Sequence, residues 1–102
     1  MVTPTVAWRD GAVELLDQTR LPAEEVVVRC ESVGALVEAI RALVVRGAPA
    51  LGVAGAYGVA LAARSGDLEA GAERLAAARP TAVNLRRGVE HALAAARAAT
   101  GD

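Results

Sequence analysis

Two short segments of the chain place an arginine one or three residues before a proline at the predicted start of a helix. Residues 46–49 read Arg-Gly-Ala-Pro, and residues 78–81 read Ala-Arg-Pro-Thr. Backbone N–H groups are free at a helix N-terminus, where the helix dipole is positive. Glycine lets a ligand approach the backbone, and arginine adds a planar set of hydrogen-bond donors. Both segments are therefore suited to an anion, and together they could hold one phosphate group from two directions.

Arginines in turns before helices also have simpler roles. Such an arginine commonly keeps the surface solvated or forms a salt bridge. A short motif by itself does not separate these roles from anion binding. On spacing alone, both interpretations of Arg46 and Arg79 remain open.

The other residues with reactive side chains are weaker candidates. Cys30 ends a predicted strand with nothing basic arranged beside it, so a buried, inert thiol is expected. His91 lies beside Glu90 on the last predicted helix and is expected to be solvated. Tyr57 is expected to pack its ring. No second histidine or cysteine supports a metal site, and no cofactor is predicted.

The first thirty residues predict three strands. Asp10-Gly11 stands between two alternating runs, which is a strong signal for a type I′ hairpin. A third strand is predicted within residues 24–30, which are rich in β-branched valine. The expected cross-strand pairs are Trp8 with Val13 and Val6 with Leu15.

The rest of the chain predicts about four helices. Apolar spacing and breakers place them from 33 to near Gly47, from Pro49 to Arg64, from 68 to about Ala78 and from Ala82 to about Thr100, with Gly101 after the last. The expected N-caps are Ser32, Asp67 and Thr81. Glycines at 52, 55 and 58 weaken a helix, so close helix packing is expected to offset them. The predicted fold class is α+β, a small three-stranded antiparallel sheet followed by a helical bundle.

Composition narrows the class of protein further. A length of 102 residues with 54% hydrophobic and 23% charged residues predicts a single domain over 1–102. A net charge of −1 with dispersed arginines does not favour a nucleic acid or an anionic membrane as partner. The apolar run over 48–63 is shorter than the ~18 residues of a membrane span. With no signal-peptide pattern and one cysteine, a cytoplasmic protein is expected.

Three segments together resemble a known family. They are L-L-D-Q-T-R-L-P at 15–22, V-V-R-G-A-P-A-L-G-V-A-G-A-Y-G-V-A-L at 44–61 and A-R-P-T-A-V-N-L at 78–85. Their order and sequence resemble the N-terminal part of methylthioribose-1-phosphate isomerase. The wider family includes ribose-1,5-bisphosphate isomerase and the α, β and δ subunits of translation initiation factor 2B. The resemblance covers essentially the whole chain.

The resemblance implies roles for individual residues. In the family, the matching residues contact the substrate, which implies substrate binding by Arg46, Gly47, Ala48 and Arg79. Asn84 belongs to the third segment and is a weaker candidate for substrate binding than these four residues. One departure follows it, because residues 86–88 read Arg-Arg-Gly where the family often has an aromatic residue, usually tryptophan. Packing against a neighbouring domain is expected to differ there.

The implied reaction converts methylthioribose 1-phosphate to methylthioribulose 1-phosphate, a step of methionine salvage. This aldose–ketose conversion needs an acid/base group near the reacting carbons. In the family, a cysteine and an aspartate of a larger, Rossmann-like C-terminal domain take these roles. The chain is expected to end before that domain, and Cys30 does not match the catalytic motif. The resemblance thus implies a phosphosugar partner, a homodimer of the full-length protein and an inactive isolated chain.

Other functions stay open. The substrate could instead be ribose 1,5-bisphosphate. The residues that would bind the end of the sugar with either a methylthio group or a second phosphate are not recognisable in the sequence. A regulatory relative would use the same fold to sense a phosphorylated ligand without turnover. A helical interaction module would use the glycine face for a partner. Both arginine segments are present, which favours the isomerase.

Overall fold

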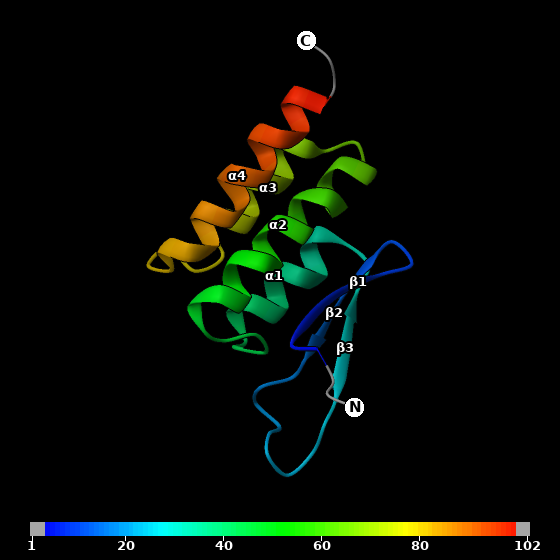
Figure 1. The fold of residues 1–102 in the computed structure, drawn as a ribbon, viewed down its shortest axis with the longest axis vertical. Helices are drawn as coiled ribbons and strands as arrows, with labels where there is room; N and C mark the ends of the chain where they lie inside the picture. The colour runs from blue at the N-terminus through cyan, green and yellow to red at the C-terminus, as the bar shows by residue number, and fades with distance from the viewer. Residues whose placement is uncertain (1–3, 100–102) are drawn as a thin grey trace.

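The N-terminal part of the chain forms a three-stranded antiparallel sheet, as predicted. The computed structural model describes residues 4–99. Its strands are β1 (Val6–Arg9), β2 (Ala12–Leu16) and β3 (Val27–Cys30), in the order β1-β2-β3. The third strand is shorter than predicted, since residues 24–26 precede it as irregular chain. Figure 1 shows the sheet against one side of the helices.

The hairpin between β1 and β2 has the predicted turn and register. Asp10 and Gly11 both have positive φ, 51° and 76°, which a type I′ turn requires. The pairs Trp8 with Val13 and Val6 with Leu15 are confirmed. This register turns one face of the sheet toward the helices and leaves charged side chains on the other.

Four helices follow the sheet. They are α1 (Val33–Arg41), α2 (Ala48–Arg64), α3 (Leu68–Ala77) and α4 (Val83–Ala99). In Figure 1, α2 and α4 begin at the same end of the molecule and run in the same direction. Helix α3, which lies between them in the sequence, runs in the opposite direction. No helix within residues 4–99 is long and apolar enough to cross a membrane.

The predicted end of the first helix is wrong. The helix stops at Arg41, about a turn and a half before Gly47. Leu43 has a positive φ of 64° and is 41% exposed, so it does not continue the buried helix face. Val44 is buried as predicted, but it belongs to the loop after α1 and not to the helix. Its N–H donates to the Ala39 carbonyl at 3.0 Å. Residues 42–47 thus form a separate loop that leads into α2.

The predicted N-caps have different outcomes. Ser32 is confirmed, because its hydroxyl accepts from the Ala35 N–H at 3.1 Å. Asp67 occupies the N-cap position of α3, but its side chain makes no capping hydrogen bond. Thr81 is wrong as a cap, since α4 begins at Val83 and the residue before it is Ala82. The predicted end at Thr100 and the residue after it lie outside the described residues.

Close packing around the glycines of α2 is confirmed. A Cβ atom placed on Gly55 would lie 2.9 Å from the Leu85 carbonyl oxygen of α4. One on Gly58 would lie 2.7 Å from a methyl group of Leu75 in α3. At Gly55 the obstacle is a backbone carbonyl, so a side chain there would force the helices apart, whereas at Gly58 the Leu75 side chain would have to move. The largest fully buried side chains of the core are Leu15, Leu36, Ile40, Leu75 and Leu85.

Candidate anion site

The start of α2 is open to a ligand. Gly47 is the N-cap residue, with a positive φ of 92° that favours glycine, and no side chain caps the helix. A Cβ placed on Gly47 would meet no atom of residues 4–99 within 4 Å, its two chain neighbours apart, so the backbone is open on that side. The first turn of α2 carries no acidic residue. Its backbone N–H groups and positive dipole end therefore have no acidic partner from this first turn.

The start of α4 has similar electrostatics. Arg79 is partly buried in the turn before the helix, and its carbonyl accepts from the Ala82 N–H at 2.9 Å. The first turn of α4 also carries no acidic residue. The other two helices differ, because Ser32 caps α1 and Glu69 lies in the first turn of α3. Both α2 and α4 have an arginine two to four residues before a first turn that carries no acidic residue.

The packing brings these two helix starts to one end of the molecule. Gly52 of α2 lies against Asn84 and Gly88 of α4, and Gly55, one turn further along, lies against Leu85 and Val89. The order of these contacts shows that the two helices run in the same direction, as Figure 1 shows. The segments 46–48 and 79–82 therefore lie at the same end of the helix pair.

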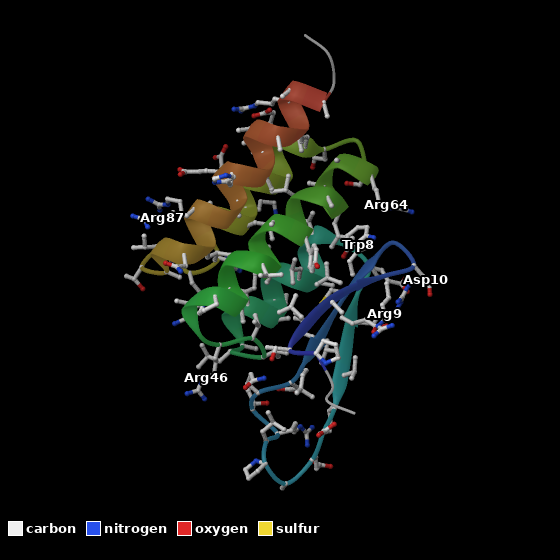
Figure 2. The ribbon with its side chains drawn as sticks, in the orientation of Figure 1. Trp8, Arg9, Asp10, Arg46, Arg64 and Arg87 are labelled. Atoms are coloured by element: carbon white, nitrogen blue, oxygen red, sulfur yellow. The ribbon has the colours of Figure 1, made fainter. Side chains whose placement is uncertain are left out.

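Neither arginine forms a salt bridge among residues 4–99, and neither donates a side-chain hydrogen bond there. Arg46 is exposed, and Figure 2 shows its side chain pointing away from the helices. The salt-bridge interpretation of Arg46 and Arg79 therefore finds no support in this part of the chain. Ion pairs with carboxylates are instead formed by Arg9, Arg20, Arg29, Arg41 and Arg97.

The D-Q-T-R segment after β2 supports the loop that carries Arg46. Asp17 is buried, and its carboxylate accepts from the Thr19 hydroxyl at 2.6 Å and the Thr19 N–H at 2.9 Å. The Gln18 N–H donates to the Val44 carbonyl at 2.8 Å. This bond ties the turn to the loop two residues before Arg46, so the first resembling segment has a structural role beside the second.

The Asp17 carboxylate gives a pH-dependent prediction. The hydrogen bond from the Thr19 hydroxyl lowers the pKa of Asp17 below its ordinary value. A lowered pKa stabilises the fold above the pKa of the unfolded chain, and this contribution is lost as the pH falls through the folded-state pKa. We expect Thr19→Val to raise the pKa of Asp17 and to reduce stability at neutral pH. The difference from wild type should close in acid.

Carboxyl NMR titration and chemical melts at several pH values measure this effect. Thr5→Val is the control, because the Thr5 side chain is exposed at the edge of the sheet. An Asp17 pKa that is the same in Thr19→Val and wild type would contradict the assigned cause.

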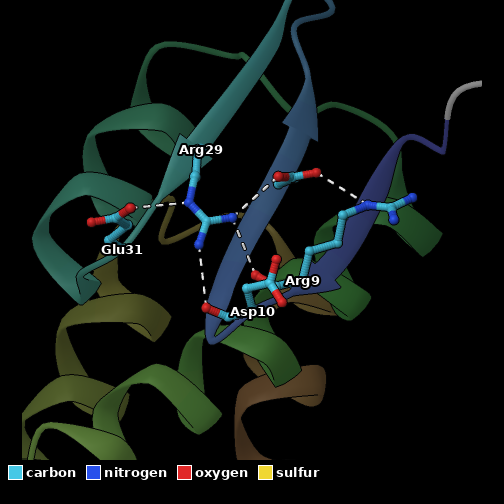
Figure 3. A network of polar contacts seen from close by, with 5 residues as sticks. Arg9, Asp10, Arg29 and Glu31 are labelled. Carbon is cyan, nitrogen blue, oxygen red and sulfur yellow. Dashed lines mark hydrogen bonds and ion pairs between the residues drawn. The ribbon is translucent and has the colours of Figure 1, made fainter.

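A second polar region lies at the opposite end of α2. Arg29 donates from Nε to Glu31 at 3.0 Å and from Nη1 to Glu14 at 3.2 Å, as Figure 3 shows. It also donates at 3.2 Å to the carbonyls of Arg9 and Asp10 in the hairpin. The bond to Glu31, followed by that to Glu14, raises the pKa of Arg29. Arg29 thus holds the hairpin turn through four hydrogen bonds, and each of its three nitrogens donates at least one.

An open pocket of about 410 Å³ adjoins this network. Arg64 reaches it from the last turn of α2, and its guanidinium lies over Gly11. The C-terminal end of a helix and the nearby carboxylates of Asp10 and Glu31 disfavour an anion there. No sequence motif predicts this pocket, because its residues come from three distant segments of the chain.

The remaining candidates agree with their expected surroundings. Cys30 is buried, and burial raises the pKa of its thiol. His91 is exposed on α4. The rings of Tyr57 and Trp8 pack with their centroids 6.1 Å apart. Across residues 4–99, no three histidine, cysteine, aspartate or glutamate side chains gather as metal ligands.

Apolar side chains are exposed near the two helix starts. Leu43 lies in the loop before α2, Val53 in the second turn of α2 and Val83 at the first residue of α4; they are 41%, 43% and 59% exposed. Val53 also lines an open apolar pocket of about 330 Å³ with residues 5–6 and 49–50. This exposed surface could not be predicted from the sequence, because valine and leucine at these positions fit equally well in a core.

The fold is an α+β domain in which the starts of α2 and α4 lie at one end. Comparisons with known proteins agree with this class. The chain is 49% identical over 102 aligned residues to a putative methylthioribose-1-phosphate isomerase of Archaeoglobus fulgidus, covering 90% of the chain and 30% of that protein. It is 52% identical to a methylthioribose-1-phosphate isomerase of Pelotomaculum thermopropionicum, covering 79% of the chain and 25% of that protein. No family model matches.

Solved structures extend the comparison. A 5-methylthioribose 1-phosphate isomerase from Pyrococcus horikoshii matches 99% of the chain and 31% of its own, with a TM-score of 0.89 and 32% identity. Subunit δ of the translation initiation factor eIF-2B from A. fulgidus matches 90% of the chain and 30% of its own, with a TM-score of 0.77 and 49% identity. The chain is thus homologous to methylthioribose-1-phosphate isomerases, and spans about a quarter to a third of their length.

Proposed function

We propose that the chain is the N-terminal, substrate-binding part of an isomerase that converts methylthioribose 1-phosphate to methylthioribulose 1-phosphate in methionine salvage. Arg46, Gly47, Ala48 and Arg79 hold the substrate phosphate. The observation that carries this proposal is that two helix starts lie at one end, each with an arginine that has no ion pair among residues 4–99 and with no acidic residue in its first turn. The names of the homologues supply the substrate class.

The physical basis is charge-assisted hydrogen bonding. A sugar phosphate carries negative charge and several acceptor oxygens, which suit guanidinium and backbone N–H donors. The Ala48 N–H is on the first residue of α2, next to the open space in front of Gly47. Apolar side chains are exposed near this end, and we expect residues outside the 102-residue chain to cover them in the complete gene product. A cytoplasmic location and a homodimer of the complete gene product belong to the same proposal.

The chemical step needs groups that this end does not provide. Segments 46–49 and 78–81 contain no histidine, cysteine, aspartate or glutamate. Cys30 is buried in the sheet, with a raised pKa that disfavours the reactive thiolate. The acid/base groups of the isomerisation are therefore assigned to a further domain, and the chain contributes binding and orientation.

The first functional prediction is that the 102-residue chain alone is inactive. Without a positioned acid or base, it should form no ketose from methylthioribose 1-phosphate above the uncatalysed background. The assay follows ketose formation, with the complete gene product as the positive control. Turnover by the isolated chain would place a catalytic group within these residues and contradict the proposed division of roles.

A second candidate function is the sensing of a phosphorylated ligand without turnover. The eIF-2B subunit δ structure favours it, because that protein shares the fold and 49% of the aligned residues. The same end of α2 and α4 would then bind the ligand in a regulatory complex. Binding of methylthioribose 1-phosphate by the complete gene product without ketose formation would support sensing, whereas ketose formation would support the isomerase.

A further inference from the structure

Helices α2 and α4 touch backbone to backbone at one crossing. A Cβ atom placed on Gly88 would lie 2.1 Å from the Gly52 carbonyl oxygen and 2.9 Å from the Gly52 Cα. From the other side, a Cβ on Gly52 would lie 3.3 Å from the Asn84 carbonyl oxygen. Since the atoms facing Gly88 belong to a helix backbone, a rotamer change cannot relieve the clash. Even one methyl group at Gly88 must push the two helices apart.

This crossing lies close to the proposed phosphate site. Gly52 and Gly88 are each in the second turn of their helix, counted from the N-terminus. The contact therefore sets how far the start of α4, with Arg79, stands from the start of α2, with Arg46. The second contact of the pair, between Gly55 and Leu85, follows one turn further along.

We propose that Gly88 is a positioning residue for the phosphate site, acting through the spacing of the two helix starts. The inference rests on the proposed function, because it assumes that both starts bind one phosphate. A Cβ at 2.1 Å must move out to at least 3.0 Å, a shift of about 1 Å. Charge-assisted hydrogen bonds are about 2.7–2.9 Å long. A shift of this size therefore breaks the hydrogen bonds between the phosphate and one of the two helix starts.

A matched control is available elsewhere in the bundle. A Cβ on Gly71 of α3 would lie 2.5 Å from the Ala62 Cβ, near the C-terminal end of α2. Gly71→Ala therefore introduces the same methyl group into a similarly tight helix crossing, but away from both helix starts. It should lower stability, as Gly88→Ala does, without changing the phosphate site.

The test is calorimetric titration of methylthioribose 1-phosphate into the complete gene product, with thermal melts of every variant. We expect Gly88→Ala to weaken binding at least about tenfold at temperatures where it is folded, and Gly71→Ala to bind as wild type does. Residues that act through one another show non-additive effects. The double variant Arg79→Ala/Gly88→Ala should therefore bind no more weakly than Arg79→Ala.

Several results would overturn the inference. If Arg79→Ala weakens binding but Gly88→Ala binds as Gly71→Ala does, Gly88 has only a packing role, and the phosphate site still stands. Fully additive losses in the double variant would likewise show that Gly88 does not act through Arg79. If neither Arg46→Ala nor Arg79→Ala changes affinity, the proposed function itself fails. Should Gly88→Ala not fold, Gly52→Ala, with its milder 3.3 Å contact, should weaken binding a few-fold, and wild-type affinity there would count against the inference.

Discussion

Replacing Arg46 or Arg79 by alanine in the complete gene product should weaken phosphosugar binding by about ten- to a hundredfold. Hydrogen bonds to a charged group contribute roughly 1.5–3 kcal/mol each, which corresponds to this range of affinity. Arg46→Lys should recover only part of the loss, because a point charge does not reproduce the planar guanidinium. Stability should change little, since neither side chain has an ion-pair partner among residues 4–99.

Calorimetric titration with parallel thermal melts measures both quantities. Arg87→Ala is the matched control, because Arg87 is another exposed arginine, and Figure 2 shows it on the outer side of α4. Its removal tests whether any loss of positive charge near the helices weakens binding. Unchanged affinity in both Arg46→Ala and Arg79→Ala would reject the phosphate site. A large loss of stability without a selective loss of binding would assign both arginines a structural role.

The sheet could be predicted from the sequence because its determinants are local. Asp10-Gly11 specifies a turn with two positive φ angles, and the alternation on either side of it specifies the register. A slip by one residue would turn Val13 and Leu15 away from the helices, where both are now fully buried. Local turn chemistry and the hydrophobic pattern therefore lead to the same pairing.

The helix ends were less predictable, because tertiary contacts decide them. The apolar spacing continues through Leu43 and Val44, yet the helix stops at Arg41. Val44 is buried from the loop, and its carbonyl accepts the Gln18 N–H from a turn twenty-six residues earlier in the chain. No pattern within a single window contains that bond. A loop in this place also lets Gly47 adopt the positive φ with which α2 begins.

The candidate site was predictable in its residues and not in its geometry. The arginine, glycine and proline types indicate two possible anion-binding segments, and the family resemblance selects the same positions. That both segments lie at one end depends on the parallel packing of α2 and α4. The sequence predicts close helix packing at Gly52 and Gly55, which is the α2 side of this contact. Gly88, which faces Gly52, lies in the segment that departs from the family pattern, and nothing in the sequence pairs it with Gly52.

The same packing predicts a large loss of stability for Gly55→Leu. A Cβ at position 55 would already lie 2.9 Å from the Leu85 carbonyl and 3.0 Å from a Val89 methyl group, and leucine adds three more carbons. Overpacking a core typically costs about 1–3 kcal/mol, and contact with a backbone carbonyl places this variant at the upper end. Replacing glycine within a helix returns about 1 kcal/mol through helix propensity, which does not offset the clash.

Chemical denaturation of the 102-residue chain measures the change in the free energy of unfolding. Ala63→Leu is the matched control, since Ala63 is exposed on the same helix and accepts a leucine with an effect within about 0.5 kcal/mol. Gly55→Leu should move the denaturation midpoint well below that of both wild type and Ala63→Leu. A midpoint equal to wild type would show that α2 and α4 are not in close contact at Gly55 in solution. The shared end of the two helices, and with it the two-sided phosphate site, would then lose its structural basis.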